Sequence, residues 1–313
     1  MATGTPTATG TLLRRRPGRD PPTVTGTLPS GHNRRPGRDP PSAIRWPRSV
    51  DLVVGGFVPP SRIAGLREDV AVTPASHPRT PATGPAPKIT VYGADPSDVR
   101  AVVLVLHGGR EHGHGRVARH QLAYLRMVPF AKAIARVGAE HGIAAWLLRN
   151  RYRGWNAPDL HPVQDARWAL DEVRRVHGDV PVLLVGHSMG GRVALRVADD
   201  PSVVGVCALA PWTPQGEPVE QLANREVLIA HGVLDRMTDP RLSYDYARRA
   251  KAITERVARF DVRGERHAML RRADQWTELV TGFVLGAFAT QPGDPRITNA
   301  MRQPSPGGLR VPL

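Results

Sequence analysis

Short apolar runs alternate along this chain with longer segments in which apolar positions recur every three to four residues. The apolar runs, which are rich in valine, isoleucine and leucine, lie at 88–92, 101–107, 143–148, 180–185, 203–210, 225–235 and 256–262. We expect them to form strands, most of them buried. The helix-type pattern lies at 117–140, 162–176, 191–199, 240–253 and 268–288. This alternation predicts an α/β fold with a mostly parallel central sheet and helices on both faces.

The two ends of the chain differ in composition from its middle. Residues 1–48 hold nine arginines against two aspartates and contain the sequence Arg-Arg-Pro-Gly-Arg-Asp-Pro-Pro twice, which predicts a disordered basic arm. Residues 49–87 are expected to form an irregular connector, 88–290 the α/β domain, and 291–313 a flexible C-terminal tail. A basic arm would suit an acidic surface or nucleic acid. A solvated tail, or sequence translated upstream of the true start, is the simpler interpretation, and no specific nucleic acid is expected.

Composition adds three expectations. The 313 residues carry a formal net charge of +15 that comes mainly from arginine, which we expect to be spread over solvated helix faces. The single cysteine, Cys207, lies in an expected strand, so it forms no internal disulfide and serves packing. No run approaches the ~20 apolar residues of a transmembrane helix, and no secretory signal is evident. We therefore expect a cytoplasmic protein with no membrane partner, while the oligomeric state is open.

The segment Gly186-His187-Ser188-Met189-Gly190 is the most informative motif of the chain. It stands between the apolar run 180–185 and the helix pattern 191–199, and so at a sharp strand-to-helix turn. Glycine two residues on either side of the serine removes Cβ atoms that would collide in such a turn. The serine hydroxyl would then point out of the sheet above a helix N-terminus. The motif predicts a nucleophilic serine, with a plain tight turn as the alternative.

A nucleophilic serine needs a base and an acid that orients the base. Asp235 comes at the end of the run 225–235, and His267 follows the run 256–262. Taken singly, Asp235 would be a turn or helix-capping residue and His267 a surface histidine. Taken together, and in this chain order, they predict a Ser-His-Asp triad, with Asp239 as the second candidate for the acid.

A third motif, His107-Gly108-Gly109, interrupts the chain directly after an apolar strand. With the other two motifs it resembles the α/β-hydrolase superfamily, in particular dienelactone-hydrolase-like and esterase-like members, over about residues 88–290. The resemblance implies that the backbone amides of Gly109 and Met189 form an oxyanion hole. The Arg110 amide is the alternative to Gly109 if the turn lies one residue later, and His107 itself is expected to be structural.

The loops expected at the carboxyl ends of the strands supply candidate substrate contacts. These candidates are Arg110, His112, His187 and Trp212. The short segment between Trp212 and Arg225 predicts a minimal cap or none. Since His107, His112, His114 and His120 are joined by no cysteine or carboxylate in a recognisable ligand spacing, no metal is expected.

These patterns together predict a serine hydrolase. It would cleave an ester-like bond, a carboxylic ester or a thioester, of a small-molecule acyl substrate through Ser188, His267 and Asp235 and an acyl-enzyme, without a cofactor. Two alternatives stay open. One is a peptidase or amidase of the same fold, and the other is a non-catalytic binding protein that keeps the fold.

Overall fold

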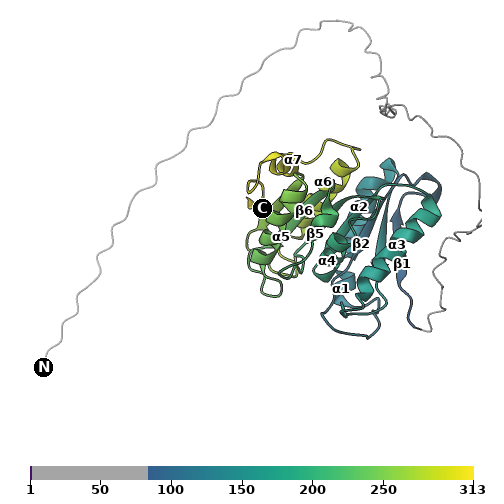
Figure 1. Cartoon of the computed structure of the whole chain (residues 1–313), viewed down its shortest axis with the longest axis horizontal. Helices are drawn as coiled ribbons and strands as arrows, with labels where there is room; N and C mark the ends of the chain where they lie inside the picture. Colours follow the sequence, from purple (N-terminus) through teal and green to yellow (C-terminus); the bar gives the residue numbers. More distant parts are fainter. Residues whose placement is uncertain (2–83) are drawn as a thin grey trace, which may run out of the picture. The chain divides into compact units, whose positions relative to one another are not determined.

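The computed structural model describes Met1 and residues 84–313; the basic arm expected at 1–48 and nearly all of the connector expected at 49–87 lie outside the described residues. An eight-stranded sheet, in the order β1-β3-β2-β4-β5-β6-β7-β8, forms the centre of the described part (Figure 1). The strands are β1 Lys88–Gly93, β2 Ala101–Leu106, β3 Ile143–Arg149, β4 Val182–His187, β5 Val203–Leu209, β6 Glu226–Gly232, β7 Val257–Val262 and β8 Val311–Pro312. Only β1 pairs antiparallel with its neighbour, β3.

Helices cover both faces of this sheet. They are α1 Leu122–Leu125, α2 Val128–Gly138, α3 His161–His177, α4 Met189–Arg196, α5 Pro240–Ile253, α6 Ala273–Ala287 and α7 Pro295–Arg302, with 3-10 turns η1 Pro96–Asp98, η2 Ala139–His141 and η3 Glu220–Leu222. Helices α3, α4 and α5 pack on one face, and α2, α6 and α7 on the other. The predicted α/β fold with a mostly parallel sheet is confirmed.

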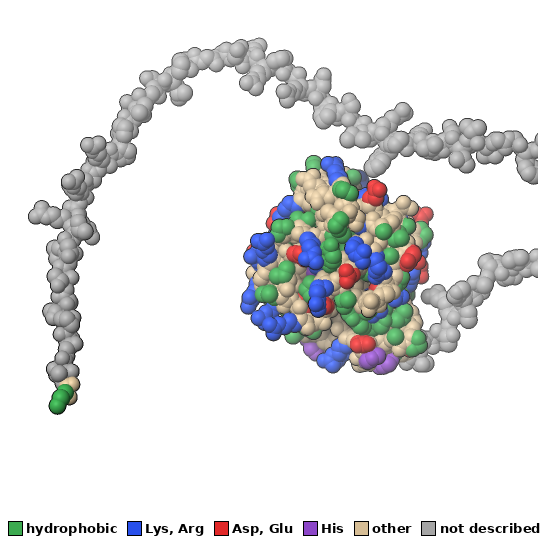
Figure 2. Space-filling view, turned by 60° about the vertical axis from the view of Figure 1, so that its left-hand side comes forward, with side chains coloured by type: hydrophobic (Ala, Val, Ile, Leu, Met, Phe, Trp, Pro, Cys, Tyr) green, Lys and Arg blue, Asp and Glu red, His purple; other side chains and the backbone are tan. Residues whose placement is uncertain are grey.

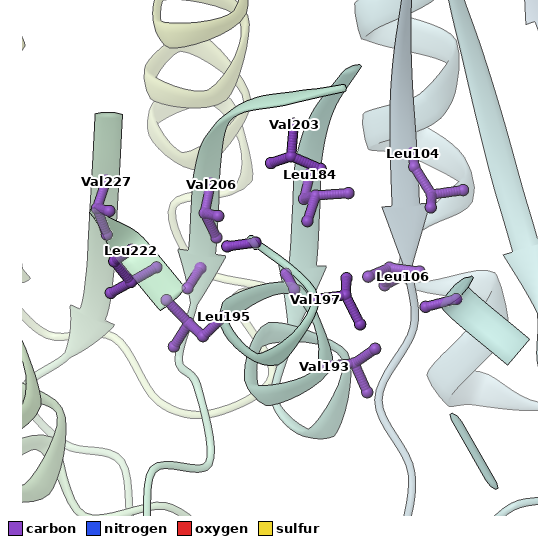
Figure 3. Packing of buried hydrophobic residues seen from close by; sticks show 14 of the residues in the cluster. Leu104, Leu106, Leu184, Val193, Leu195, Val197, Val203, Val206, Leu222 and Val227 are labelled. Carbon is purple, nitrogen blue, oxygen red and sulfur yellow. The ribbon is translucent and has the colours of Figure 1, made fainter. Parts of the chain in front are cut away.

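The continuous apolar runs follow from burial of each strand on both sides. Every residue of β2 is buried, and its side chains alternate between the two cores. In Figure 3, Leu104 of β2 and Leu184 of β4 lie above the helix that carries Val193 and Leu195. A parallel sheet needs such two-sided burial because helical crossovers cover both of its faces. Between β5 and β6 the described chain adds only η3, in agreement with the predicted minimal cap.

Two expected helices are shorter in the structure. The pattern at 117–140 divides into α1 and α2, because Pro129 lacks an N–H and fits only the first turn of a new helix. The pattern at 268–288 becomes helical only at Ala273. The preceding loop is held by the buried carboxylate of Glu265, which accepts hydrogen bonds from the amides of Arg271 (3.1 Å) and Arg272 (2.9 Å).

The flexible tail expected at 291–313 is contradicted by the structure. This segment contains α7, and β8 pairs with β7. Leu309 is completely buried, and Ile297 packs into the core on the α2–α6 face. The buried Lys251 ammonium donates to the carbonyl oxygens of Val257 (2.7 Å) and Met301 (3.2 Å) and so ties β7 to the end of α7. A few apolar residues at the right spacing fix this segment although proline and glycine dominate its composition.

Charged side chains are mixed on the surface. In Figure 2, Lys and Arg side chains alternate with acidic and hydrophobic ones over the visible face. This distribution agrees with the expected solvated arginines. Cys207 is fully buried, as predicted, and burial raises the pKa of its thiol. Among the described residues, no helix combines the length and the apolar character that crossing a membrane requires.

Candidate active site

Ser188 stands at a strained turn between β4 and α4. Its φ of 57° and ψ of −118° lie in a region that residues other than glycine rarely adopt. The turn also requires its glycines, since a Cβ on Gly190 would lie 2.3 Å from the Leu106 carbonyl oxygen and one on Gly186 2.2 Å from the Gly190 carbonyl oxygen. The backbone therefore forms the sharp strand-to-helix turn that the motif predicts.

The structure brings Ser188, His267 and Asp235 together from the ends of three different strands. The Ser188 hydroxyl oxygen lies 3.0 Å from Nε2 of His267, and Nδ1 of the same ring lies 2.7 Å from Oδ2 of Asp235. A carboxylate at Nδ1 holds the proton on that nitrogen, so Nε2 faces the serine with its lone pair. A hydroxyl, an imidazole and a carboxylate in this order can activate an alcohol by general-base catalysis.

Asp235 accepts hydrogen bonds on both carboxylate oxygens. Oδ1 accepts from the amides of Met237 (2.8 Å) and Thr238 (3.1 Å), and Oδ2 accepts from the Thr238 hydroxyl (2.8 Å). Burial would raise the pKa of Asp235, but the hydrogen bonds from His231 and His267 outweigh burial and lower the pKa far below its usual value. The carboxylate is therefore charged and fixed in place.

A second histidine behind Asp235 has no counterpart in the sequence expectations. Nε2 of His231 lies 3.2 Å from Oδ2 of Asp235 and 3.2 Å from the Thr238 carbonyl oxygen, two acceptors, so this nitrogen is the donor. Nδ1 of His231 lies 2.8 Å from the Ser243 hydroxyl, which accepts in turn from Nε of Arg259 at 3.2 Å. Burial lowers the pKa of His231, so the ring stays neutral.

These supporting residues were missed for identifiable reasons. His231 is visible in the sequence as the histidine of the His-Gly turn that precedes Asp235. Thr238, Ser243 and Arg259 carry no motif, and only the folding of β6, α5 and β7 brings them together. Asp239, the second candidate for the acid, instead caps α5. It accepts a hydrogen bond from the Arg241 amide (2.9 Å) and forms an ion pair with the Arg241 guanidinium (2.8 Å).

The backbone amides of Gly109 and Met189, two residues that line the Ser188 pocket, are the candidate donors to an oxyanion. Met189 is the first residue of α4, where a backbone N–H has no partner within the helix. The Gly109 amide donates to no other group within residues 84–313, whereas the Arg110 amide is engaged by the Arg153 carbonyl oxygen at 2.9 Å. The geometry thus favours Gly109 over the alternative, Arg110. His107 holds the turn, as its Nδ1 lies 2.6 Å from the Gly108 carbonyl oxygen and its Nε2 accepts from the Asn150 amide at 3.1 Å.

The pocket at Ser188 has a volume of about 210 Å³. It is lined by Gly109, Arg110, Glu111, Ser188, Met189, Trp212, Met237, Thr238 and His267. Of the four expected substrate contacts, Arg110 and Trp212 are among these residues, and His112 and His187 are not. His187 lies behind the site, where its Nε2 donates to the His267 carbonyl oxygen (2.9 Å) and burial lowers its pKa to about 3. It therefore supports the His267 loop.

The pocket wall at Trp212 is braced from behind. The Arg192 guanidinium lies 4.4 Å from the Trp212 ring centre and 4.0 Å from that of Trp155, and it pairs with Glu217 at 2.7 Å. A cation held between two aromatic faces fixes both rings. The wall is therefore expected to keep its position without a ligand.

Two other features of the described residues lie outside this pocket. A cavity of about 630 Å³ includes Lys251 and Glu226 and lies at the opposite end of the strands. In the segments after β2 and β3, the side-chain atoms of His114, Asp159 and His161 that could bind a metal ion lie within 4.8 Å of one another. Ligands of a tetrahedral zinc ion are closer, about 3.3 Å apart for bonds of about 2.0 Å, so these side chains would have to rotate to share an ion.

Comparison with known proteins agrees with this geometry. The sequence pattern of the Alpha/beta hydrolase family matches residues 102–311. The chain belongs to the alpha/beta hydrolase family. The match runs past residue 290, in agreement with the ordered C-terminal segment. This alpha/beta hydrolase also has structural neighbours with the same fold and little sequence identity.

Est1E from Butyrivibrio proteoclasticus, solved with ferulic acid bound, has a TM-score of 0.51 at 14% identity, with 65% of this chain and 96% of that chain covered. A protein of unknown function from Agrobacterium tumefaciens has a TM-score of 0.52 at 17% identity, with 66% and 95% covered. A segment of 114 residues is 32% identical to part of the magnesium-chelatase 30 kDa subunit of Rhodobacter capsulatus. The matched segment covers 34% of this chain and 34% of that subunit. The alpha/beta hydrolase thus matches about a third of the length of that relative.

Proposed function

We propose that this alpha/beta hydrolase is a serine hydrolase that cleaves a carboxylic ester or a thioester of a small-molecule substrate. This proposal is supported by two contacts on the wall of an open pocket. The Ser188 hydroxyl oxygen lies 3.0 Å from Nε2 of His267, and Nδ1 of His267 lies 2.7 Å from Oδ2 of Asp235. An ester or a thioester releases an alcohol or a thiol, which is a better leaving group than the amine released from an amide. Cleavage of an amide is the alternative within the same fold.

In the first step, Nε2 of His267 takes the proton of Ser188 while the serine oxygen attacks the substrate carbonyl carbon. The carbonyl oxygen becomes negatively charged and accepts hydrogen bonds from the amides of Gly109 and Met189. Asp235 stabilises the imidazolium that forms. His267 then returns the proton to the leaving alcohol or thiol, and an acyl-serine remains.

In the second step, water attacks the acyl-serine with His267 as the base. The second tetrahedral intermediate uses the same two amides, and its collapse releases the acid and restores the Ser188 hydroxyl. Every proton in the cycle passes through Nε2 of His267. The side chains and backbone amides of the site supply each of these roles, so the proposed mechanism includes no cofactor.

A labelling experiment on the full chain tests this proposal. We expect a fluorophosphonate to modify Ser188, because an activated serine beside two amide donors attacks tetrahedral phosphorus. Ser188→Ala should abolish the labelling and lower ester turnover by about 10⁴–10⁶, as the loss of a triad nucleophile does. Ser202→Ala is the matched control, since the Ser202 hydroxyl bonds Asp200 near the start of β5. Unchanged turnover in Ser188→Ala would overturn the mechanism, and a parallel set of ester, thioester and amide substrates would decide among the bonds.

A further inference from the structure

Some of the exposed large apolar side chains lie near the proposed active site. Nine such side chains within residues 84–313 are exposed: Val91, Leu122, Leu125, Val176, Val233, Leu234, Met237, Ile253 and Leu270. Met237 lines the Ser188 pocket, and Leu270 follows the proposed base, His267, by three residues. Leu122 is 76% exposed and Leu270 71%, so water contacts most of each side chain. An apolar cluster beside a reactive group indicates a binding role.

Three of these leucines form a hollow, which we call the apolar trough. Leu122, Leu125 and Phe130 line it from α1 and α2, and Met269 and Leu270 line it from the loop after His267. Its volume is about 380 Å³. Its walls are joined by a hydrogen bond from the Arg126 guanidinium to the Ala268 carbonyl oxygen. The trough is therefore a formed feature of the surface.

A second hollow, which we call the connecting hollow, borders both the trough and the Ser188 pocket. This connecting hollow, about 290 Å³, shares Gly109 and Arg110 with the Ser188 pocket and shares Leu122 with the trough. The other residues that line it are His107, Gly108, Val117, Gln121, Ala123 and Arg153. The three hollows therefore adjoin one another, from the Ser188 pocket past Gly109 to the leucines of the trough.

We propose that the apolar trough binds the hydrocarbon chain of the acyl group, so that the enzyme prefers esters of medium- and long-chain acids. This inference rests on the proposed hydrolase function and specifies its substrate class. We assign the trough to the acyl side because the acyl group stays bonded to Ser188, beside Gly109 and the adjoining hollow, after the alcohol or thiol has left. Each methylene buried in the trough should raise kcat/KM about twofold to fourfold, and the gain should end when the trough is full.

The first test measures chain-length selectivity with the full chain. The substrates are p-nitrophenyl butanoate and decanoate, each below its micelle concentration, and the proteins are the unmodified chain, Leu122→Ser, Leu270→Ser and the double variant. The ratio of kcat/KM for decanoate to that for butanoate should fall about tenfold in the double variant. Val91→Ser and Val176→Ser, exposed apolar positions on β1 and α3, are the matched controls and should leave the ratio unchanged.

The second test needs no catalysis. Ser188→Ala protein should bind a dansyl-labelled undecanoate, and adding Leu122→Ser and Leu270→Ser should weaken the binding about tenfold or more. The triple variant could lose probe binding while the unmodified chain hydrolyses no ester. That result would overturn the proposed function and leave the trough supported. An unchanged decanoate-to-butanoate ratio with unchanged probe binding would overturn the trough and leave the function intact. Dependence on the length of the alcohol instead of the acyl chain, or binding of anionic vesicles without chain-length selectivity, would also overturn it.

Discussion

At the scale of single residues, Asp235 is the point where the polar network of the site converges. Its two oxygens receive hydrogen bonds from two backbone amides, one hydroxyl and two imidazoles. A carboxylate with so many donors keeps its charge and its orientation, which is what the proposed base, His267, needs from an acid. Asp239, four residues later, has the same side chain and a different task, the capping of α5.

Replacing each of the two aspartates separately by asparagine tests this assignment. Asp235→Asn should lower ester turnover by about 10⁴, because an amide no longer stabilises the imidazolium and can enforce the wrong tautomer. Asp239→Asn should change turnover by less than about threefold, since asparagine also caps helices well. Initial rates on one activated ester, with circular dichroism as the check on folding, give the comparison. The opposite ranking would assign the acid role to Asp239.

His231 acts through Asp235 and is a positioning residue. His231→Leu removes a hydrogen bond to a buried carboxylate, so turnover should fall about 10–100-fold. His231→Gln keeps a donor near the place of Nε2 and should restore much of the activity. Equal turnover of His231→Gln and His231→Leu, with both variants folded, would show that the residue only fills space.

At the scale of elements, the strands and the elbow were predictable and the C-terminal segment was not. The apolar runs identify β2 to β7 because strands buried on both faces consist almost entirely of apolar residues. The elbow was predictable because its steric demand selects glycine at two fixed positions. The segment after residue 290 is rich in proline and glycine, and its order depends on contacts of Ile297 and Leu309 with distant elements. Local composition contains no such information.

A substitution in this segment should therefore destabilise the whole domain. Leu309→Ala removes a fully buried side chain next to β7, and the free energy of unfolding should fall by roughly 2–4 kcal/mol. Arg302→Ala changes an exposed side chain at the end of α7 and should cost less than about 0.5 kcal/mol. Urea unfolding followed by circular dichroism measures both. Equal stability of the two variants would mean that the segment contributes nothing to the core.

At the scale of the whole molecule, buried neutral histidines link folding to pH. Burial lowers the pKa of His107 to about 4 and that of His187 to about 3. In the unfolded chain both rings have the ordinary value of about 6.5. The unfolded state therefore binds more protons below about pH 6.5, and the stability that is complete above this pH is lost as the pH falls toward 4 and then 3.

This linkage predicts a steep acid dependence of stability. Between pH 6 and pH 5 the two groups together should remove roughly 2–3 kcal/mol from the free energy of unfolding, since each contributes about 1.4 kcal/mol per pH unit. Urea titrations at pH 7, 6 and 5 measure the slope. His187→Gln, which cannot titrate, should reduce that slope by roughly 1 kcal/mol per pH unit, whatever it does to the absolute stability. A slope that is the same with and without His187 would contradict the argument.

The sequence by itself determined the fold and the three motif residues, Ser188, Asp235 and His267. These follow from local patterns, namely continuous burial of strands, the steric demand of a sharp turn and the order of reactive residues at strand ends. The cytoplasmic location and the roles of residues 1–87 stay predictions. Only the tertiary structure decided which groups surround the motif, such as His231 behind Asp235, His187 behind His267 and the leucines beside the pocket. His231 and Asp235 are four positions apart, but His187 and His267 are 80 positions apart. Such distant contacts depend on how helices cover the sheet, and no local pattern in one sequence records that arrangement.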